Sequence, residues 1–408
     1  MHGGDAIDVL QISFGASKLN KRLAIILGIR PDVVRASILL DILRSNKHGT
    51  VFIWSGQHYS SNMKDVFFSQ LHVGPPDFEL NAHGESDSEI VASVISRLFR
   101  VLNKIRPAAA VFLGDTNTVM GCVAAAQLNI PVVHIEGCMR SYDWRMPEEK
   151  YRVVTDHLSD VIYAYLDEYK GQGIAEGLNP DSIVVTGNPI VDVLERHFLA
   201  RNQYYEKLAS DNFFGDRGIR KKEFYLMTCH RRENVENALS LANIMNLAGG
   251  AARPVYFPAS YRTERMMKFH SIDLPKNVKM VEPIGYDEFL TLMSNSRGVL
   301  SDSGTVAEEA CVLRIPSIQM RLSTERPQLY DVGASVKFNP LKDQNPKHAL
   351  AKLEGLYGKT WQNPLGDGKS SERIAVDLLR RLQKDEFERH RPADYCLDIS
   401  HSFRDDGL

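Results

Sequence analysis

Short apolar runs alternate with helical patterns along most of the chain. The first set of runs lies at residues 22–27, 51–54, 109–113, 132–135 and 161–164. After residue 189 the alternation restarts, with runs at residues 224–228, 255–257, 278–281, 298–301 and 316–320. Runs this short predict buried strands, and the amphipathic segments between them predict helices, so each set predicts a parallel, doubly wound sheet. The pattern therefore predicts an α/β fold with two Rossmann-like domains that face each other across an interdomain cleft.

The same pattern suggests where the domains begin and end. We expect a leader outside the fold at 1–21, a first Rossmann-like domain at 22–187 and a second at 188–367. In the following segment, 368–385, Ile374, Leu378 and Leu382 fall on one helical stripe, which predicts a helix that crosses back to the first domain. Residues 386–408 lack periodicity and are expected to form a tail.

Composition narrows the class of protein. A chain of 408 residues suits two domains, and its net charge of −2 gives no basic surface for nucleic acid or an anionic membrane. No apolar run reaches the roughly 18 residues that a membrane span needs. The five cysteines are far apart and form no CxxC pair, so they do not indicate a metal site. We expect a cytoplasmic protein that binds neither nucleic acid nor membranes.

Acidic residues follow the predicted strands of the first half. Asp115 comes just after 109–113, and Glu136 follows 132–135 directly. Glu148 and Glu149 open a helix behind Pro147, where capping would explain one of them. The carboxyl ends of parallel strands face the ligand crevice, so these acids are expected to converge there. Neighbouring carboxylates push their pKa values apart, which lets one act as a base and another as an acid.

Other strand ends carry groups suited to phosphate. Arg30, in GIRPDVVR (28–35), is expected beside a helix N-terminus, although an ion-pair role is equally compatible with it. Ser303 and Gly304, in SDSGTVAEEA (301–310), can offer a hydroxyl and backbone N–H groups at another helix N-terminus. His230, in TCHRREN (228–234), is placed for phosphate binding or proton transfer. No GxGxxG motif follows the first strand, which disfavours a dinucleotide.

Taken in order, these motifs carry a family resemblance. Between residues 22 and 385 the chain resembles the bacterial UDP-N-acetylglucosamine 2-epimerases. The matching blocks are GIRPDVVR, SGQHYSSNM, GDTNT, HIEGCMRS with MPEEKYR, TGNPIVDVL, TCHRREN, SDSGTVAEEA, STERP and NPLGDGKSSERI. The resemblance implies a GT-B fold with the active site between the domains, a homodimer, and no metal or other cofactor.

The resemblance also implies a reaction and residues for it. The family inverts C2 of a UDP-HexNAc, typically UDP-GlcNAc to UDP-ManNAc, by expelling UDP to form a 2-acetamidoglucal and then adding UDP back. Asp115, Glu136, Glu148 and His230 match its catalytic residues. The expected UDP- and substrate-binding residues are Arg30, Arg35, Gln57, His58, Arg140, Arg152, Arg231, Ser303, Gly304, Thr305, Glu309 and Arg326.

Some positions depart from the family pattern and keep alternatives open. Arg35 stands where a lysine is frequent, and Ser260 stands where a histidine is usual. RSYDWRMPEE (140–149) is similar to the branch that makes UDP-N-acetyl-L-fucosamine from a 6-deoxy-L-talo sugar. A hydrolysing 2-epimerase that releases ManNAc, a GT-B glycosyltransferase and a non-catalytic UDP-sugar sensor are further alternatives.

Overall fold

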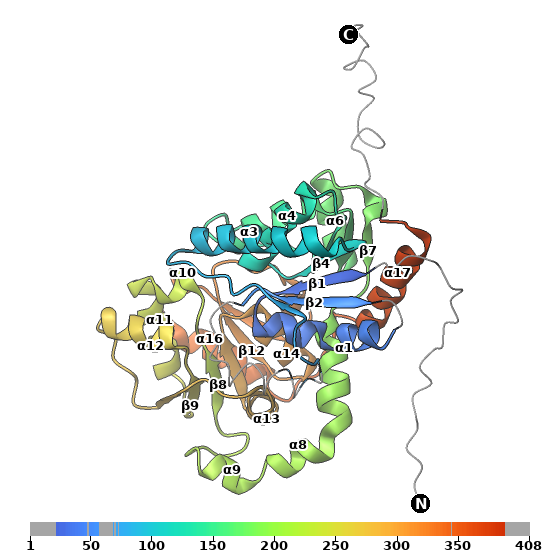
Figure 1. The fold of residues 1–408 in the computed structure, drawn as a ribbon. Helices are drawn as coiled ribbons and strands as arrows, with labels where there is room; N and C mark the ends of the chain where they lie inside the picture. Colours follow the sequence, from blue (N-terminus) through green and yellow to red (C-terminus); the bar gives the residue numbers. More distant parts are fainter. Residues whose placement is uncertain are drawn as a thin grey trace, which may run out of the picture.

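Two parallel sheets with helices on both faces form the molecule (Figure 1). The computed structural model describes residues 22–46, 49–56, 68, 71, 73–343 and 345–387. The strand order is β3-β2-β1-β4-β5-β6-β7 in the first sheet and β10-β9-β8-β11-β12-β13 in the second. In both sheets the chain starts near the centre and winds outward to either side, which is the doubly wound arrangement. The predicted fold class is confirmed.

Each predicted apolar run forms a strand. The strands of the first sheet are β1 Leu23–Leu27, β2 Thr50–Trp54, β3 Phe78–Glu79, β4 Ala109–Leu113, β5 Val132–Ile135, β6 Val161–Ala164 and β7 Ile183–Val185. Those of the second are β8 Tyr225–Thr228, β9 Val255–Pro258, β10 Val278–Val281, β11 Gly298–Ser301, β12 Ser317–Met320 and β13 Ser335–Phe338. The sequence pattern missed β3, β7 and β13. All three lie at sheet edges, where a strand is short or, as at Lys337 in β13, exposes a polar side chain.

Helices connect the strands. Those up to the domain crossover are α1 Arg30–Ser45, α3 Asp87–Ile105, α4 Cys122–Gln127, α5 Pro147–Leu158, α6 Asp167–Ala175 and α7 Pro189–Val193. The following ones are α8 Asn202–Leu208, α9 Asp211–Gly215, α10 Arg232–Val235, α11 Ala238–Gly249, α12 Tyr261–Phe269, α13 Tyr286–Ser294, α14 Gly304–Val312, α15 Gln328–Asp331, α16 Pro346–Leu356 and α17 Ser370–Lys384. Short 3₁₀ or π turns are η1 Asn117–Gly121, η2 Pro180–Ser182, η3 Leu194–Phe198 and η4 Leu199–Arg201. None of the helices in the described ranges is long and apolar enough to cross a bilayer.

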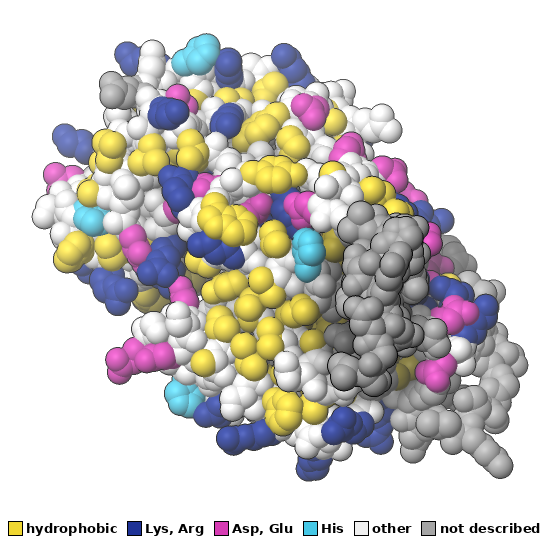
Figure 2. Space-filling view, turned by 90° about the horizontal axis from the view of Figure 1, so that it is seen from above, with side chains coloured by type: hydrophobic (Ala, Val, Ile, Leu, Met, Phe, Trp, Pro, Cys, Tyr) yellow, Lys and Arg dark blue, Asp and Glu magenta, His cyan; other side chains and the backbone are white. Residues whose placement is uncertain are grey.

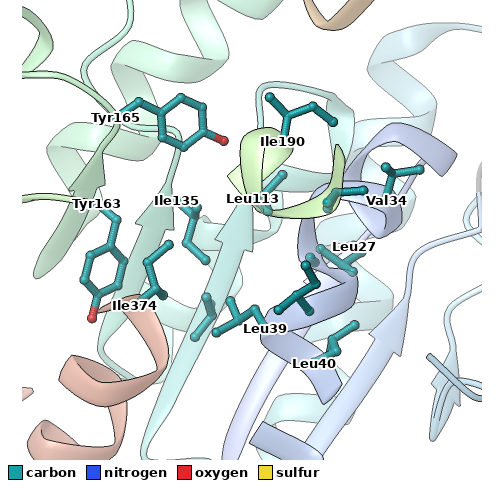
Figure 3. Close-up of a cluster of buried hydrophobic side chains, with 14 of the residues drawn as sticks. Leu27, Val34, Leu39, Leu40, Leu113, Ile135, Tyr163, Tyr165, Ile190 and Ile374 are labelled. Atoms are coloured by element: carbon teal, nitrogen blue, oxygen red, sulfur yellow. The ribbon is translucent and has the colours of Figure 1, made fainter. Parts of the chain in front are cut away.

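The inner strand β1 of the first sheet buries both of its faces. Leu23, Ile25 and Leu27 belong to the apolar cluster drawn in Figure 3, together with side chains of α1 and α17. Ala24 and Ile26 point to the other face, where they pack with residues of α3 and α4. Side chains alternate across a strand, so a continuous apolar run is what a sheet covered on both faces requires.

The helix α17, Ser370–Lys384, lies in the segment that the sequence predicts to cross back to the first domain. Its buried side chains include Ile374, Leu378 and Leu382, and it packs against α1 (Figure 1) and α7. Phe387, just beyond the helix, is also buried in the first-domain cluster. The exact domain boundaries stay predictions, and the predicted leader, together with residues 388–408 of the predicted tail, lies outside the described residues.

Candidate active site

The carboxyl ends of both sheets open onto a cleft of about 290 Å³. Side chains from the loops after β1, β4 and β5 meet side chains from the loops after β8, β11 and β12 there. The sequence-predicted site residues that line it are Arg35, Asp115, Glu136, Glu148, His230, Arg231, Ser303, Gly304, Thr305 and Arg326. The cleft thus brings together acids from one domain and phosphate-suited groups from the other.

Four predicted residues do not line this cleft. Arg30 instead donates from Nη1 to the backbone oxygen of Ile284 in the second domain, at 3.4 Å. The remaining three are buried near the cleft and engaged with other side chains: Arg140, Arg152 and Glu309. Gln57 and His58 lie outside the described residues.

Just after β1, the backbone at Gly28 passes very close to the side chain of Thr118. A Cβ on Gly28 would lie 1.7 Å from Oγ1 of Thr118, so only glycine lets the chain turn here into α1. In the first turn of α1, Asp32 accepts a hydrogen bond from Nη2 of Arg35 at 3.0 Å. Burial raises the pKa of Asp32 to about 6, even though Arg35 pulls it down. Arg35 is thereby held with its guanidinium toward the cleft.

Glu136 joins the two domains. Its strand β5 pairs with β4 in a register that sets Leu113 beside Ile135, so Asp115 and Glu136 extend from neighbouring strand ends. The Glu136 carboxylate forms ion pairs with Arg35 of the first domain and with Nη2 of Arg326 of the second, the latter at 3.1 Å. Only 2% of Glu136 is exposed. The predicted convergence of the acids is therefore present, and a cation of the opposite domain meets it.

The two glutamates at the start of α5 have different environments. Glu149 is buried and accepts hydrogen bonds from the backbone N–H groups of Ser141 and Tyr142 at 3.0–3.1 Å and 2.9 Å, and it pairs with Arg152. It therefore fixes the preceding loop. Glu148 instead lines the cleft. Helix capping was expected to explain one of the two, but the backbone hydrogen bonds of Glu149 come from the loop at 141–142 and not from N–H groups of α5.

Two acids that face the cleft, Asp115 and Glu148, have pKa values shifted in opposite directions. Burial raises the pKa of Glu148 above its usual value, and Arg231 only partly offsets this. Burial acts on Asp115 in the same direction, but Arg152 and Arg231 outweigh it and hold its pKa below the usual value. Asp115 therefore gives up its proton more readily than Glu148, which suits Asp115 to the role of a base and Glu148 to that of an acid.

The second domain contributes the N-terminus of α14, with the guanidinium of Arg326 next to Gly304. Ser303 is the N-cap of α14 and accepts from the N–H of Val306 at 3.4 Å. A Cβ on Gly304 would lie 2.4 Å from Nη1 of Arg326, so glycine here leaves room for the guanidinium. The arrangement combines free N–H groups, the helix dipole and a cation, which is suited to a diphosphate.

His230, in the loop after β8, lines the same cleft. Its backbone N–H and that of Arg231 donate to the buried carboxylate of Asp302, at 3.0 and 2.9 Å. Nδ1 of His230 is 3.7 Å from Oδ1 of Asp302, and the side chain is 50% exposed. Asp302 therefore holds the loop after β8 so that the imidazole is presented to the cleft.

Sequence reasoning did not assign Glu325, which also lines the cleft. Its carboxylate lies 2.7–3.6 Å from the guanidinium groups of Arg152, Arg231, Arg321 and Arg326. Burial alone would raise the pKa of Glu325, but these cations hold it well below the usual range. The only sequence signal was its position next to Arg326 after a predicted strand, because the partners come from distant segments.

Residues 41–379 match the family described as UDP-N-acetylglucosamine 2-epimerase. The chain belongs to this family. The UDP-N-acetylglucosamine 2-epimerase of Methanocaldococcus jannaschii is 36% identical over 364 residues, which cover 86% of this chain and 97% of that protein. Its crystal structure in complex with UDP-GlcNAc and UDP covers 88% of this chain and 99% of its own, at 35% identity and a TM-score of 0.79.

The name of a further relative contains a different sugar. The UDP-2,3-diacetamido-2,3-dideoxy-D-glucuronate 2-epimerase of Pseudomonas aeruginosa is 30% identical over 372 residues, which cover 88% of this chain and 99% of that protein. The two relatives are thus both named 2-epimerases, but the sugars in their names differ. The GT-B arrangement expected from the sequence is confirmed by the two sheets and by these structural relatives.

Proposed function

We propose that the protein is a non-hydrolysing UDP-HexNAc 2-epimerase that interconverts UDP-GlcNAc and UDP-ManNAc. The observation that carries this proposal is the Glu136–Arg326 pair, which places an acid of the first domain against a phosphate-suited arginine of the second inside one cleft. The 36% identical M. jannaschii relative, named for this reaction, supports the same substrate. A glycosyltransferase would use the second-domain groups but would not need the acids of the first.

The proposed reaction proceeds in two halves. A carboxylate, Asp115 or Glu136, removes the proton from C2 of the sugar while the C1–O bond breaks and its electron pair leaves with UDP, which gives 2-acetamidoglucal. UDP then adds back to C1, and a proton is delivered to the other face of C2. Glu148, whose pKa is raised, suits the role of proton donor. Atoms balance because UDP is both leaving group and nucleophile.

UDP would bind mainly to the second domain. Ser303, Gly304 and Thr305 offer the end of α14 to the diphosphate, Arg231 and Arg326 neutralise its charge, and His230 can hydrogen-bond to it. Since these cations take the place that a metal ion would hold, activity is expected to persist in the presence of a chelator. Three buried residues would support the site through the side chains they contact: Arg140, Arg152 and Glu309. The first domain would complete it with Gln57, His58, Arg30 and Arg35.

The test follows the sugar by proton NMR in D₂O. Incubation with UDP-GlcNAc should produce UDP-ManNAc with deuterium at C2. Free ManNAc would instead indicate hydrolysis, and an unchanged sugar would contradict both reactions for this substrate. The same experiment with the 6-deoxy-L-talo sugar and with the diacetamido-glucuronate sugar distinguishes the other branches of the family.

We further propose that the protein is a homodimer and acts in the cytoplasm. Apolar side chains gather on the face that α3 and α4 cover, seen from above in Figure 2. Phe99 on α3 and Val154 on α5 are 40% and 36% exposed, and Ile95 and Val123 are partly buried beside them. A contiguous apolar surface of this kind suits burial against a second copy. Cys122, Cys138, Cys229 and Cys311 are free thiols, which fits a reducing compartment.

A further inference from the structure

One buried carboxylate, that of Asp156, is linked to the loops that carry Glu136 and Asp115, to the first directly and to the second through His134. Asp156, on α5, is fully buried and does not line the cleft. Its Oδ1 is 2.7 Å from Nδ1 of His134, and its Oδ2 accepts from the backbone N–H of Cys138 at 2.9 Å. Nη1 of Arg140 adds an ion pair to Oδ2 at 2.8 Å. Asp156 therefore reaches the loop after β5 through the backbone of Cys138.

The same carboxylate reaches the loop after β4 through His134. Nε2 of His134 is 2.8 Å from the backbone oxygen of Gly114, the residue before Asp115. A carbonyl oxygen can only accept, so Nε2 carries a proton and donates it. His134 is itself fully buried in β5, and its ring spans the space between Asp156 and Gly114. The chain of contacts from Asp156 through His134 to Gly114 joins α5, β5 and the end of β4.

The loop after β5 needs such support because its backbone is strained. Glu136 has φ 78° and Cys138 has φ 64°, which lie in the left-handed region that residues with a Cβ rarely occupy. Such conformations persist where the surroundings over-determine them, and they cluster at active sites. The hydrogen bond from the Cys138 N–H to Asp156 is the contact that holds the second strained residue in place.

We propose that Asp156 is a positioning residue for the reaction: through the Cys138 backbone and through His134 it fixes the orientation of Glu136 and Asp115 toward the cleft. Its carboxylate contacts His134, Arg140 and the backbone N–H of Cys138, and it does not line the cleft, so it would act on the reaction through these groups. The proposal rests on the proposed function for the part that concerns turnover. It extends the site by two buried residues, Asp156 and His134, that no sequence argument had assigned.

The first test compares two buried aspartates, Asp156 and Asp160, that both contact strand β5. Asp156→Asn keeps the shape of the side chain but replaces an acceptor by a donor, so it should lower kcat about 100-fold through misplacement of the acids. KM and the Kd for UDP should change less than about 3-fold, because the UDP-suited groups lie mainly in the second domain. Asp160→Asn is the matched control, since Oδ2 of Asp160 accepts from the N–H of Val132 at 2.8 Å, at the other end of β5. It should lower the melting temperature to a similar degree and leave kcat unchanged.

A rescue experiment separates positioning from a general loss of stability. Glycine adopts left-handed backbone conformations without a Cβ penalty, so Cys138→Gly added to Asp156→Asn should recover kcat about 10-fold. Cys138→Gly alone should keep the kcat of the unchanged enzyme. Unchanged kcat in Asp156→Asn, an equal loss in Asp160→Asn, or no recovery with glycine would overturn the proposal.

Two further measurements keep the test decisive. If Asp156→Asn does not fold, His134→Asn replaces it, because it leaves the Asp156–Arg140 pair while its shorter side chain cannot reach Gly114; kcat at the level of the unchanged enzyme then overturns the proposal. If the unchanged enzyme does not epimerise UDP-GlcNAc, the proposed substrate is wrong. A crystal structure of Asp156→Asn then decides about positioning: Cys138 leaving the left-handed region supports it, and an unchanged loop at 136–138 overturns it.

Discussion

Oε1 of Glu136 lies 3.1 Å from Nη2 of Arg326, and the two residues belong to different domains. Both are buried, with 2% and 3% exposed. A buried ion pair needs its partner, because removal of one member leaves a charge without compensation in a low-dielectric site. This one ion pair therefore both joins the two domains and holds two residues of the candidate site together.

Glu136→Gln should abolish most turnover while UDP still binds. The amide cannot take a proton from C2, and the loss of a general base of this kind costs about 10²–10⁴ in rate. Deuterium incorporation at C2 measures the turnover, and calorimetric titration with UDP measures the binding. Glu264→Gln, on α12 and paired with Lys268 at 2.7 Å on the surface, serves as the control and should keep full turnover. Turnover near the normal rate in Glu136→Gln would show that Glu136 is not catalytic.

Arg326→Leu should destabilise the protein by about 3–5 kcal/mol, because it leaves the buried Glu308 without its cation and weakens the compensation of Glu325. Urea unfolding followed by tryptophan fluorescence measures the change. Arg253→Leu is the comparison, since its pair with Glu354 is about one-third exposed and should contribute at most about 1 kcal/mol. Equal effects of the two substitutions would contradict a buried network around Arg326.

Glu309→Gln should flatten the dependence of stability on pH. Burial raises the pKa of Glu309 from 4.5 to about 7, although the hydroxyl of Tyr286 donates to Oε1 at 2.7 Å. The folded state thus binds more protons than the unfolded state in this range, so stability is full below about 4.5 and falls as pH rises through about 7. The glutamine keeps an acceptor for Tyr286 but does not ionise.

The measurement for Glu309 is the melting temperature between about pH 5 and about pH 8. The decrease over this range should be smaller in Glu309→Gln than in the unchanged protein. Asp32 contributes the same sign in a lower range, because burial raises its pKa to about 6, and this part should remain. An identical pH profile in both proteins would show that Glu309 does not titrate in that range.

Phe99→Asp should shift a dimer to monomers. The substitution puts a charge into the apolar face of α3 and α4, and burial of an unpaired carboxylate in an interface is costly. Light scattering coupled to size exclusion gives the mass in solution. Phe269→Asp, at a 75% exposed apolar residue at the end of α12 in the other domain, is the control and should not change the mass. If the unchanged protein is a monomer, the proposed dimer is wrong.

The sequence predicted the strands well where they are buried on both faces, and poorly at the edges. The run at 109–113 became β4 with its bounds unchanged, because a central strand must be apolar throughout. The two-residue strand β3 has no such requirement and gives no periodic signal. In the same way, Asp115 and Glu136 could be placed at strand ends, whereas the buried position of Arg140 depends on Asp156 in α5 and on Glu176, just after α6.

The order of the βα units and the residues at their strand ends follow from the sequence, because apolar runs and the turns after them are local properties of the chain. The family resemblance follows from it too, since the motifs occur in order along the chain. Which of those residues face the cleft depends on how the chain packs: Glu148 faces it and its neighbour Glu149 does not. Ion pairs such as Glu136 with Arg326 join residues far apart in sequence, and packing of the two domains alone brings them within reach.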